Sequence, residues 1–273
     1  MSKSDGGFST PIAMTVIFPL SLAILSLSML VAANGRKLKS YDNFVLARKE
    51  ADSVLSDLKR DFQILKDVPC DSDSSFVLHE ILARYSEYSL TIADASTGIH
   101  RNFMNENFYD SKPVCDYMAM KGDAAVTEYG WVNPKHADKK ILDGVIADFD
   151  GETPFPIVNT FPPYNIHFMS CEFLEAVLEH CGIKNAEENA KKIFGMISDE
   201  TDIAKLAELI GVAETHPVFD FIGVKTVFWK IQFETGQCDV SAIFAAVPKK
   251  DNQRSVERYI LIDKEISHEG RAL

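Results

Sequence analysis

One short run of acidic side chains has the types and spacing that a metal ion needs. Asp148, Asp150 and Glu152 alternate with Phe149 and Gly151, and calcium takes several oxygen ligands from a tight loop that contains glycine. The run is too short for an EF-hand, and a solvated turn is the ordinary interpretation of such a sequence. These three residues are therefore a candidate calcium site, and the sequence predicts no other metal or cofactor.

No arrangement of catalytic residues is recognisable along the 273 residues. The sequence has no G-x-S-x-G motif, no H-E-x-x-H motif and no glycine-rich phosphate loop. The histidines are scattered, at positions 79, 100, 136, 167, 180, 216 and 268. A histidine without a spaced partner is more often structural than catalytic, so we predict that the chain is not an enzyme and has no catalytic residue.

The cysteines do not form a recognisable site. They are odd in number, widely spaced and without a C-x-x-C pair: Cys70, Cys115, Cys171, Cys181 and Cys238. One or two disulfides are compatible with this spacing if the domain lies outside the cytoplasm. Cys171 and Cys181 fall on one predicted helix, about 15 Å apart, so we do not expect these two to pair.

The whole chain is organised around an apolar stretch near its N-terminus. Residues Pro11 to Ala33 include no charged side chain, and about 20 apolar residues are enough to cross a bilayer as a helix. Pro19 removes one amide but is tolerated in membrane helices. We therefore expect a transmembrane helix over residues 8–34, and sequence typical of a soluble domain follows Asn34.

The residues before this stretch leave three alternatives open. Val31-Ala32-Ala33 has the form of a secretory cleavage site, and the stretch would also serve as an uncleaved anchor. The third alternative starts from Gly6-Gly7-Phe8, which resembles the leader of type IV pilin and pseudopilin precursors. The resemblance implies cleavage between Gly7 and Phe8, so that residues 1–7 are a leader. Ile12 stands near the position where most of that family carries an acidic residue.

Charge gives two further constraints. The net charge of −12 disfavours a nucleic-acid partner, because phosphate binding relies on Lys and Arg. Arg36, Lys37 and Lys39 follow the apolar stretch, and the positive-inside bias would place the domain in the cytoplasm. The pilin resemblance implies the opposite, and we follow it: a single-pass inner-membrane protein with its head in the periplasm.

The next segment has the periodicity of an amphipathic helix. Apolar residues between Lys37 and Lys66 recur at steps that form one stripe: Tyr41, Phe44, Ala51, Leu55, Leu58, Phe62 and Leu65. This predicts an extended helix over residues 35–68, which ends at Val68-Pro69 and either packs on the head or continues the membrane helix as one rod. Asn34-Gly35 is the expected flexible point, because glycine weakens a helix interior.

The head is predicted to mix helices and strands. A short helix is expected from Phe76 to Tyr85, then strand sequence that turns at residues 96–98. This strand–turn–strand resembles the large minor pseudopilin of type II secretion, pseudopilin K, on the following residues: Ile92, Asp94, Gly98, Ile99 and Asn102. Residues 103–133 are predicted to form loops and short helices, and the proline-rich segment 154–163 is predicted to be a boundary.

The helical part that follows resembles the same family. Ser170 is placed as the N-cap of a helix, with its inner face at Phe173, Leu174, Val177 and Leu178. Gly182-Ile183 ends it, and helices 186–197 and 203–210 follow. In the family, an Asn-apolar-Asn sequence leads into the first helix; here the corresponding residues are Asn165, Ile166 and His167, so histidine stands in place of the second asparagine.

The last third of the chain alternates like strands. Runs at 228–233, 240–247 and 258–262, separated by turns, predict an antiparallel meander that covers the stripe of the rod. The expected fold class is α+β, with a transmembrane helix extended into a long pilin-like helix and an antiparallel sheet head with a helical insertion. The expected divisions are 69–160 for a mixed α/β head, 161–215 for a helical subdomain and 216–273 for the meander.

Together these features predict a minor pseudopilin or pilin-like structural subunit. The resemblance implies a place near the tip of a type II secretion or type IV pilus-like filament, processing by a prepilin peptidase, and other minor pseudopilins or pilins as partners. The alternative is a membrane-anchored or secreted extracytoplasmic ligand-binding domain.

Overall fold

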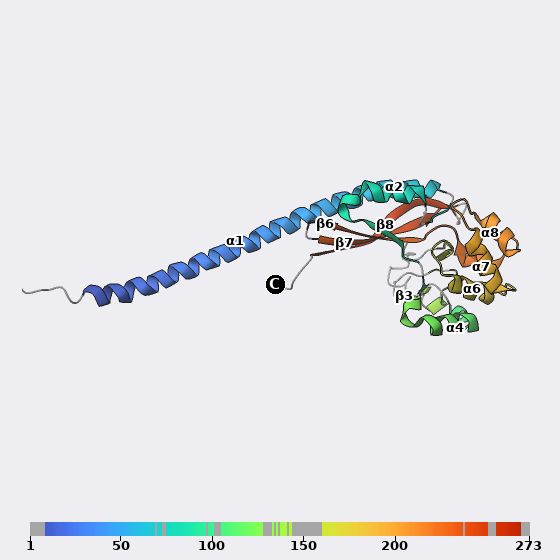
Figure 1. Ribbon diagram of the computed structural model, residues 1–273, viewed down its shortest axis with the longest axis horizontal. Coiled ribbons are helices and arrows are strands. Elements are labelled where there is room, and N and C mark those ends of the chain that lie inside the picture. The colour runs from blue at the N-terminus through green and yellow to red at the C-terminus, as the bar shows by residue number, and fades with distance from the viewer. Residues whose placement is uncertain are drawn as a thin grey trace, which may run out of the picture.

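The computed structural model describes most of the chain. The described residues are 9–68, 70–72, 75–96, 98–100, 105–127, 133, 135, 137–140, 142–143, 160–236, 238–250 and 255–268. Figure 1 shows a long helix that projects from a head of strands and helices.

The long helix α1 runs from Ser9 to Asp61, 53 residues, with Pro19 inside it. It is continuous through Asn34 and Gly35, so the flexible point expected there is not a break in the helix. A 3₁₀ segment, η1, extends it over Phe62–Asp67. Val68 is then extended, with φ −76° and ψ 137°, as expected for the residue before a proline. The end of the rod is where the sequence predicts it.

A four-stranded antiparallel sheet lies against the upper part of α1. Its strands are β1 (Thr91–Asp94), β6 (Phe228–Thr235), β7 (Cys238–Pro248) and β8 (Val256–His268), in the order β1-β6-β7-β8. Strands β6 and β7 are joined by a tight turn in which Gly236 has φ +57°, a conformation that favours glycine. The predicted meander is therefore confirmed.

The predicted strand–turn–strand around residues 96–98 forms differently from a hairpin. Strand β1 pairs with β6, whereas β2 (Ile99–His100) pairs in parallel with β3 (Val126–Thr127). The two strands separate because Asp94 Oδ1 accepts hydrogen bonds from the Ser96 amide and hydroxyl, which turns the chain out of the sheet. A second short parallel pair joins β4 (Tyr164–Asn165) to β5 (Ile222–Gly223).

The described helices agree closely with the sequence. Their bounds are α2 Phe76–Arg84, η2 Ser86–Tyr88, α3 Glu106–Tyr109, α4 Lys112–Lys121, η3 Gly122–Ala125, α6 Cys171–His180, α7 Ala186–Met196, α8 Ile203–Ile210 and η4 Pro217–Asp220. Ser170 caps α6 by accepting a hydrogen bond from the Phe173 amide, as predicted. Ser75 stands at the N-cap position of α2 but makes no side-chain capping bond.

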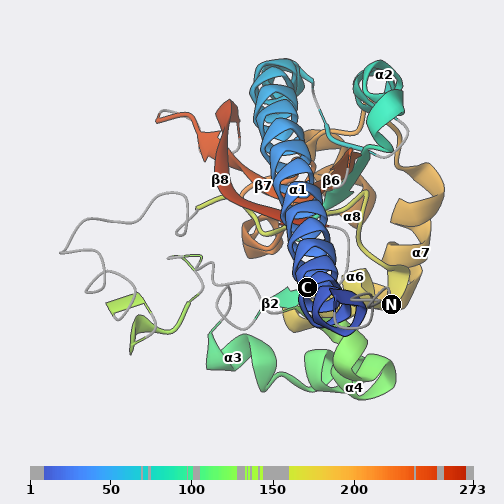
Figure 2. The same ribbon diagram turned by 90° about the vertical axis from the view of Figure 1, so that its left-hand side faces the viewer.

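One hydrophobic core joins the rod, the sheet and the helices. Phe62 stacks on Phe244 with ring centroids 5.1 Å apart and meets Trp229 and Tyr259 edge-on. Phe168 continues this contact from Trp229 towards the helices, where the predicted inner face of α6 is fully buried. The stripe of the rod is buried from Ala47 onward, whereas Tyr41 is 65% exposed. Figure 1 and Figure 2 show α1 along one face of the sheet, and Figure 1 shows α6, α7 and α8 beyond its upper end.

Candidate functional site

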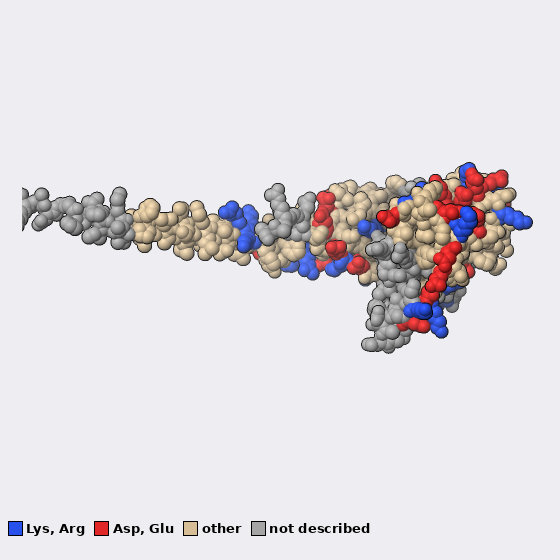
Figure 3. All heavy atoms as spheres, turned by 90° about the horizontal axis from the view of Figure 1, so that it is seen from below, with Lys and Arg blue, Asp and Glu red and all other residues tan. Residues whose placement is uncertain are grey.

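The lower part of α1 is an exposed apolar surface. Large apolar side chains on it have about half or more of their surface exposed: Ile17, Phe18, Leu20, Leu22, Ile24, Leu25, Leu27, Met29, Leu30 and Val31. Among the described residues, α1 is the one helix long and apolar enough to cross a membrane. The end of this surface is marked in the sequence by Arg36, Lys37 and Lys39, and Figure 3 shows basic side chains on the rod between its uncharged part and the head.

The serines within this surface do not expose unpaired hydroxyls. Ser21, Ser26 and Ser28 each donate a hydrogen bond to the carbonyl four residues earlier, at 2.8, 2.6 and 2.8 Å. Their polar groups are therefore satisfied within the helix and do not oppose insertion into hydrocarbon.

The upper part of α1 is pinned to the sheet by polar contacts as well as by its apolar stripe. Thr235 Oγ1 donates to the Ala47 carbonyl at 3.1 Å, and Lys264 forms an ion pair with Asp52 at 2.6 Å. Further up, the Gln63 amide bonds both the N–H and the C=O of Tyr259, at 3.1 and 2.9 Å. The head is thus fixed along the rod over several turns.

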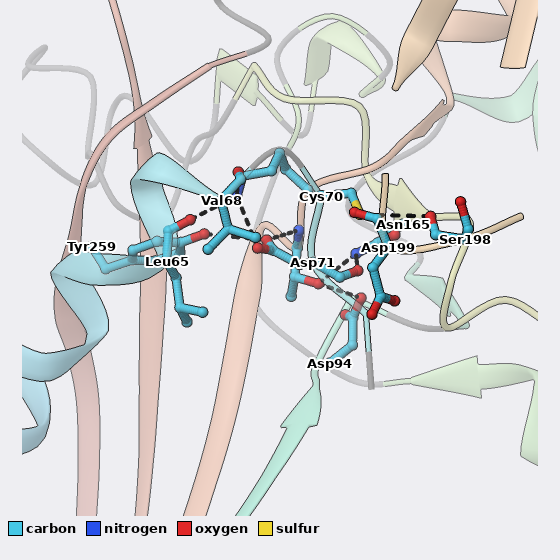
Figure 4. Close-up of polar contacts among 11 residues, drawn as sticks. Leu65, Val68, Cys70, Asp71, Asp94, Asn165, Ser198, Asp199 and Tyr259 are labelled. Atoms are coloured by element: carbon cyan, nitrogen blue, oxygen red, sulfur yellow. Dashed lines mark hydrogen bonds and ion pairs between the residues drawn. The ribbon is translucent and has the colours of Figure 1, made fainter. Parts of the chain in front are cut away.

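A buried lysine links the upper end of the rod to the segment just before β6. Lys225 is 8% exposed, and its ammonium donates to the Leu65 and Val68 carbonyls at 2.8 and 2.9 Å and to Asp71 Oδ1 at 2.8 Å (Figure 4). Carbonyls at a helix end have no partner within the helix, so this side chain satisfies them and uses all three of its donors.

Asp71 completes the pair and also contacts two further segments of the chain. Its Oδ2 accepts from the Thr226 amide at 2.8 Å and from the Tyr259 hydroxyl at 3.3 Å, and its carbonyl accepts from Asn165 Nδ2 at 2.8 Å. Burial raises the pKa of the Asp71 carboxyl, while the ammonium of Lys225 acts in the opposite direction. We name this cluster of Asp71, Asp94, Asn165, Lys225 and Thr226 the polar junction.

Asp94 and Asn165 are the outer members of the polar junction. Asn165 Nδ2 donates to Thr226 Oγ1 at 2.9 Å, and that hydroxyl donates to Asp94 Oδ2 at 3.2 Å. Burial raises the pKa of the Asp94 carboxyl to about 7, although bonds from Ser96 and Thr226 act against the shift. Asn165 Oδ1 also accepts from the His167 main-chain amide at 3.1 Å, a bond that does not use the side chain at position 167.

A buried thiol links the same loop to the segment before α8. Cys70 Sγ donates to the Asp199 carbonyl at 2.6 Å, and Ser72 Oγ donates to Asp199 Oδ1 at 2.5 Å. Burial raises the pKa of the Cys70 thiol to about 11. At neutral pH it is protonated and a poor nucleophile. All five cysteines are free thiols.

The contacts of the polar junction hold several segments together. Its ammonium is saturated, and its carboxylates accept bonds from neighbouring donors. The partly buried His180 packs edge-on to Phe108 and Phe221. Within the described ranges no group of three His, Cys, Asp or Glu side chains is arranged to hold a metal ion.

The sites that the sequence predicts are not among these residues. Gly7 and Phe8, the predicted processing site, and Asp148, Asp150 and Glu152, the candidate calcium ligands, lie outside the described residues, as does Asn102. Sequence reasoning missed the polar junction. Its one signal is Lys225, a charged residue within the otherwise uncharged run from Ile222 to Trp229, where a charge is unexpected unless it is paired.

A second feature of the head is a hollow of about 540 Å³ on the sheet face opposite α1. Its lining is mostly polar and includes Thr91, Lys230, Gln232, Ser241 and Glu265. The lining residues come from all four strands of the sheet.

Comparison of the chain with protein-family models and with curated proteins finds no match.

Proposed function

We propose that this chain is a structural subunit of a pilin-like filament, anchored in the inner membrane with its head in the periplasm. More specifically, the proposal is a minor pseudopilin or pilin of a type II secretion or type IV pilus-like system, placed near the tip. The observation that supports it most is α1, one 53-residue helix whose lower part is exposed and apolar and whose upper part packs on an antiparallel sheet.

The exposed lower part of α1 needs an apolar environment. Leaving one large apolar side chain in water instead of burying it costs about 1.5–3 kcal/mol, and about ten such residues follow one another here. A bilayer covers all sides of such a helix, and neighbouring helices in a filament do the same. Both environments suit the proposed subunit before and after assembly.

The polar junction suits a subunit whose head must keep a fixed position relative to its anchor helix. Filament assembly needs the head to keep a fixed orientation relative to its anchor helix. Lys225 and Asp71 tie the end of the helix to the sheet at a buried point, and Gln63 and Asp52 add contacts along the rod.

The test is to place a charge on the apolar surface and compare it with the same charge on the head. Leu25→Arg puts a cation near the bilayer centre, which costs about 3 kcal/mol on insertion scales. Met196→Arg, at a position 53% exposed on α7, is the matched control. We expect Leu25→Arg to abolish membrane incorporation and secretion or piliation together in the native host, and Met196→Arg to leave both intact. Full function of Leu25→Arg would refute the proposal.

The mature N-terminus separates the alternatives for the leader. Mass spectrometry of the protein from its native host should give a chain that starts at Phe8 if a prepilin peptidase processes it. A start at Asn34 indicates a secreted protein, and an intact Met1 or Ser2 indicates a plain anchor.

The second candidate function is ligand binding by an anchored or secreted domain, and the hollow on the outer face of the sheet favours it. Under this alternative, Lys230→Ala combined with Gln232→Ala in its lining should abolish function, while Leu25→Arg should leave the activity of the domain intact.

A further inference from the structure

The outer edge of β8 is an unpaired strand edge within the described part of the chain. The sheet ends at β8, since its order is β1-β6-β7-β8. Tyr259 shows how this edge is satisfied at one point, because the Gln63 amide bonds its N–H and C=O as a neighbouring strand would. Alternate residues of a strand direct their main-chain groups to the same side, so those of Leu261 face the same edge.

A groove of about 380 Å³ runs beside this edge. Ser56, Lys59, Arg60 and Gln63 of the rod line one wall, and Arg258, Tyr259 and Ile260 of β8 line the other. Figures 1 and 2 both place the upper end of the rod next to β8.

The groove is basic in an acidic protein. Three cations and no carboxylate are among its lining residues, whereas the whole chain carries a net charge of −12. Arg60 forms an ion pair with Asp57 at 3.2 Å and lies 3.8 Å from Asp61. Lys59 and Arg258 are exposed and make no ion pair with any described residue. Two cations therefore remain available for a ligand from outside.

We propose that this groove binds an acidic, extended segment of another protein, which adds to the sheet as a strand beside β8. Main-chain hydrogen bonds to the edge from Leu261 onward would supply affinity, and Lys59 and Arg258 would select acidic side chains. A second β8 is a poor occupant. That strand carries cations of its own at Arg258 and Lys264, whereas the groove selects acidic side chains. The proposal does not depend on the filament role.

The experiment uses the full-length protein in detergent micelles and three synthetic peptides. One peptide alternates valine with glutamate, one alternates valine with lysine, and one is the acidic peptide with alternate amides N-methylated along one edge. N-methylation removes strand pairing without changing charge. We expect saturable binding of the acidic peptide alone, measured by fluorescence anisotropy, and slower hydrogen exchange at Leu261 when it is bound.

A variant of the protein tests the cations. Arg258→Glu should weaken binding of the acidic peptide about tenfold at low salt, and added salt should reduce the difference between variant and wild type. Lys184→Glu, an equal change of net charge at an exposed turn of the helical part, should leave binding unchanged. Equal binding of the basic or the N-methylated peptide would overturn the proposal, and so would absence of binding or an Arg258→Glu variant that binds as well as Lys184→Glu.

Discussion

At the scale of single residues, the replacement of Lys225 has the largest expected effect on stability. Its ammonium compensates a carboxylate that is 1% exposed, and removing one partner of a buried pair leaves the other charge uncompensated. Lys225→Met should therefore lower the free energy of unfolding by about 3–5 kcal/mol in urea titrations of the full-length protein. Lys264→Met, which breaks the exposed pair with Asp52, should cost less than about 1 kcal/mol.

The double variant checks the cause of this loss. Adding Asp71→Asn to Lys225→Met should recover part of the stability, because the buried charge is then gone. Equal losses for Lys225→Met and Lys264→Met would show that the polar junction is not a buried ion pair.

Asp94 gives a pH-dependent prediction at the same scale. Its pKa is raised from 3.8 to about 7 in the folded protein, so between these values the folded state binds more protons than the unfolded state. Asp94 therefore contributes to the free energy of unfolding fully below about pH 4, and this contribution is lost as the pH rises to about 7. Asp94→Asn should remove this decline, which has a slope of at most about 1.4 kcal/mol per pH unit.

The measurement is the free energy of unfolding of wild type and variant at several pH values between 4 and 8. Asp263→Asn, at an exposed position on β8, should keep the wild-type slope. Parallel curves for wild type and Asp94→Asn would contradict the raised pKa.

The grouping of these residues into one cluster could not have been found from the sequence. Asp71, Asp94, Asn165 and Lys225 come from four separate segments, and only the packed rod and sheet bring them together. Ser170, by contrast, acts on an amide three residues away, and so the sequence alone identified it as a cap.

At the scale of elements, the sequence predicted the helices and strands whose residue pattern repeats within one segment of the chain. The periodicity of α6 to α8 and the alternation of β6 to β8 each repeat over enough residues to distinguish a helix from a strand. The parallel pairs β2–β3 and β4–β5 have two residues a strand, too few for any periodicity, and their partners lie far apart in the chain. Tyr41 continues the helical pattern but remains exposed, because the stripe becomes buried only from Ala47 onward.

Among the contacts between elements, the one that Gln63 makes with β8 has the clearest test. It satisfies the edge of β8 at Tyr259, so Gln63→Ala should speed hydrogen exchange at the Tyr259 amide and lower stability by about 1–2 kcal/mol. Gln232→Ala, on the outer face of the sheet, should change neither quantity. Unchanged exchange at Tyr259 in Gln63→Ala would mean that the edge is protected by other means.

At the scale of the whole molecule, the sequence predicted the long N-terminal apolar helix and the α+β class of the head but not how they share a core. The predicted division into rod, mixed head, helical part and meander follows changes of pattern along the chain. In the structure, Phe62 of the rod packs on Phe244 and Trp229, and Phe168 joins Trp229 to the helical part. Such contacts depend on which faces meet, and the pattern of one segment does not contain that information.

This shared core predicts where the chain can be cut. A fragment of residues 39–273 lacks the apolar surface but keeps the buried stripe from Ala47 to Leu65, so it should be soluble and show mixed helix and strand by circular dichroism. It should also melt in one cooperative transition. A fragment of residues 69–273 removes Leu58, Phe62 and Leu65, each 0% exposed, and uncovers one face of the sheet, so it should aggregate or melt without a transition. Cooperative melting of the shorter fragment would show that the rod is an attachment to the head and not part of its core.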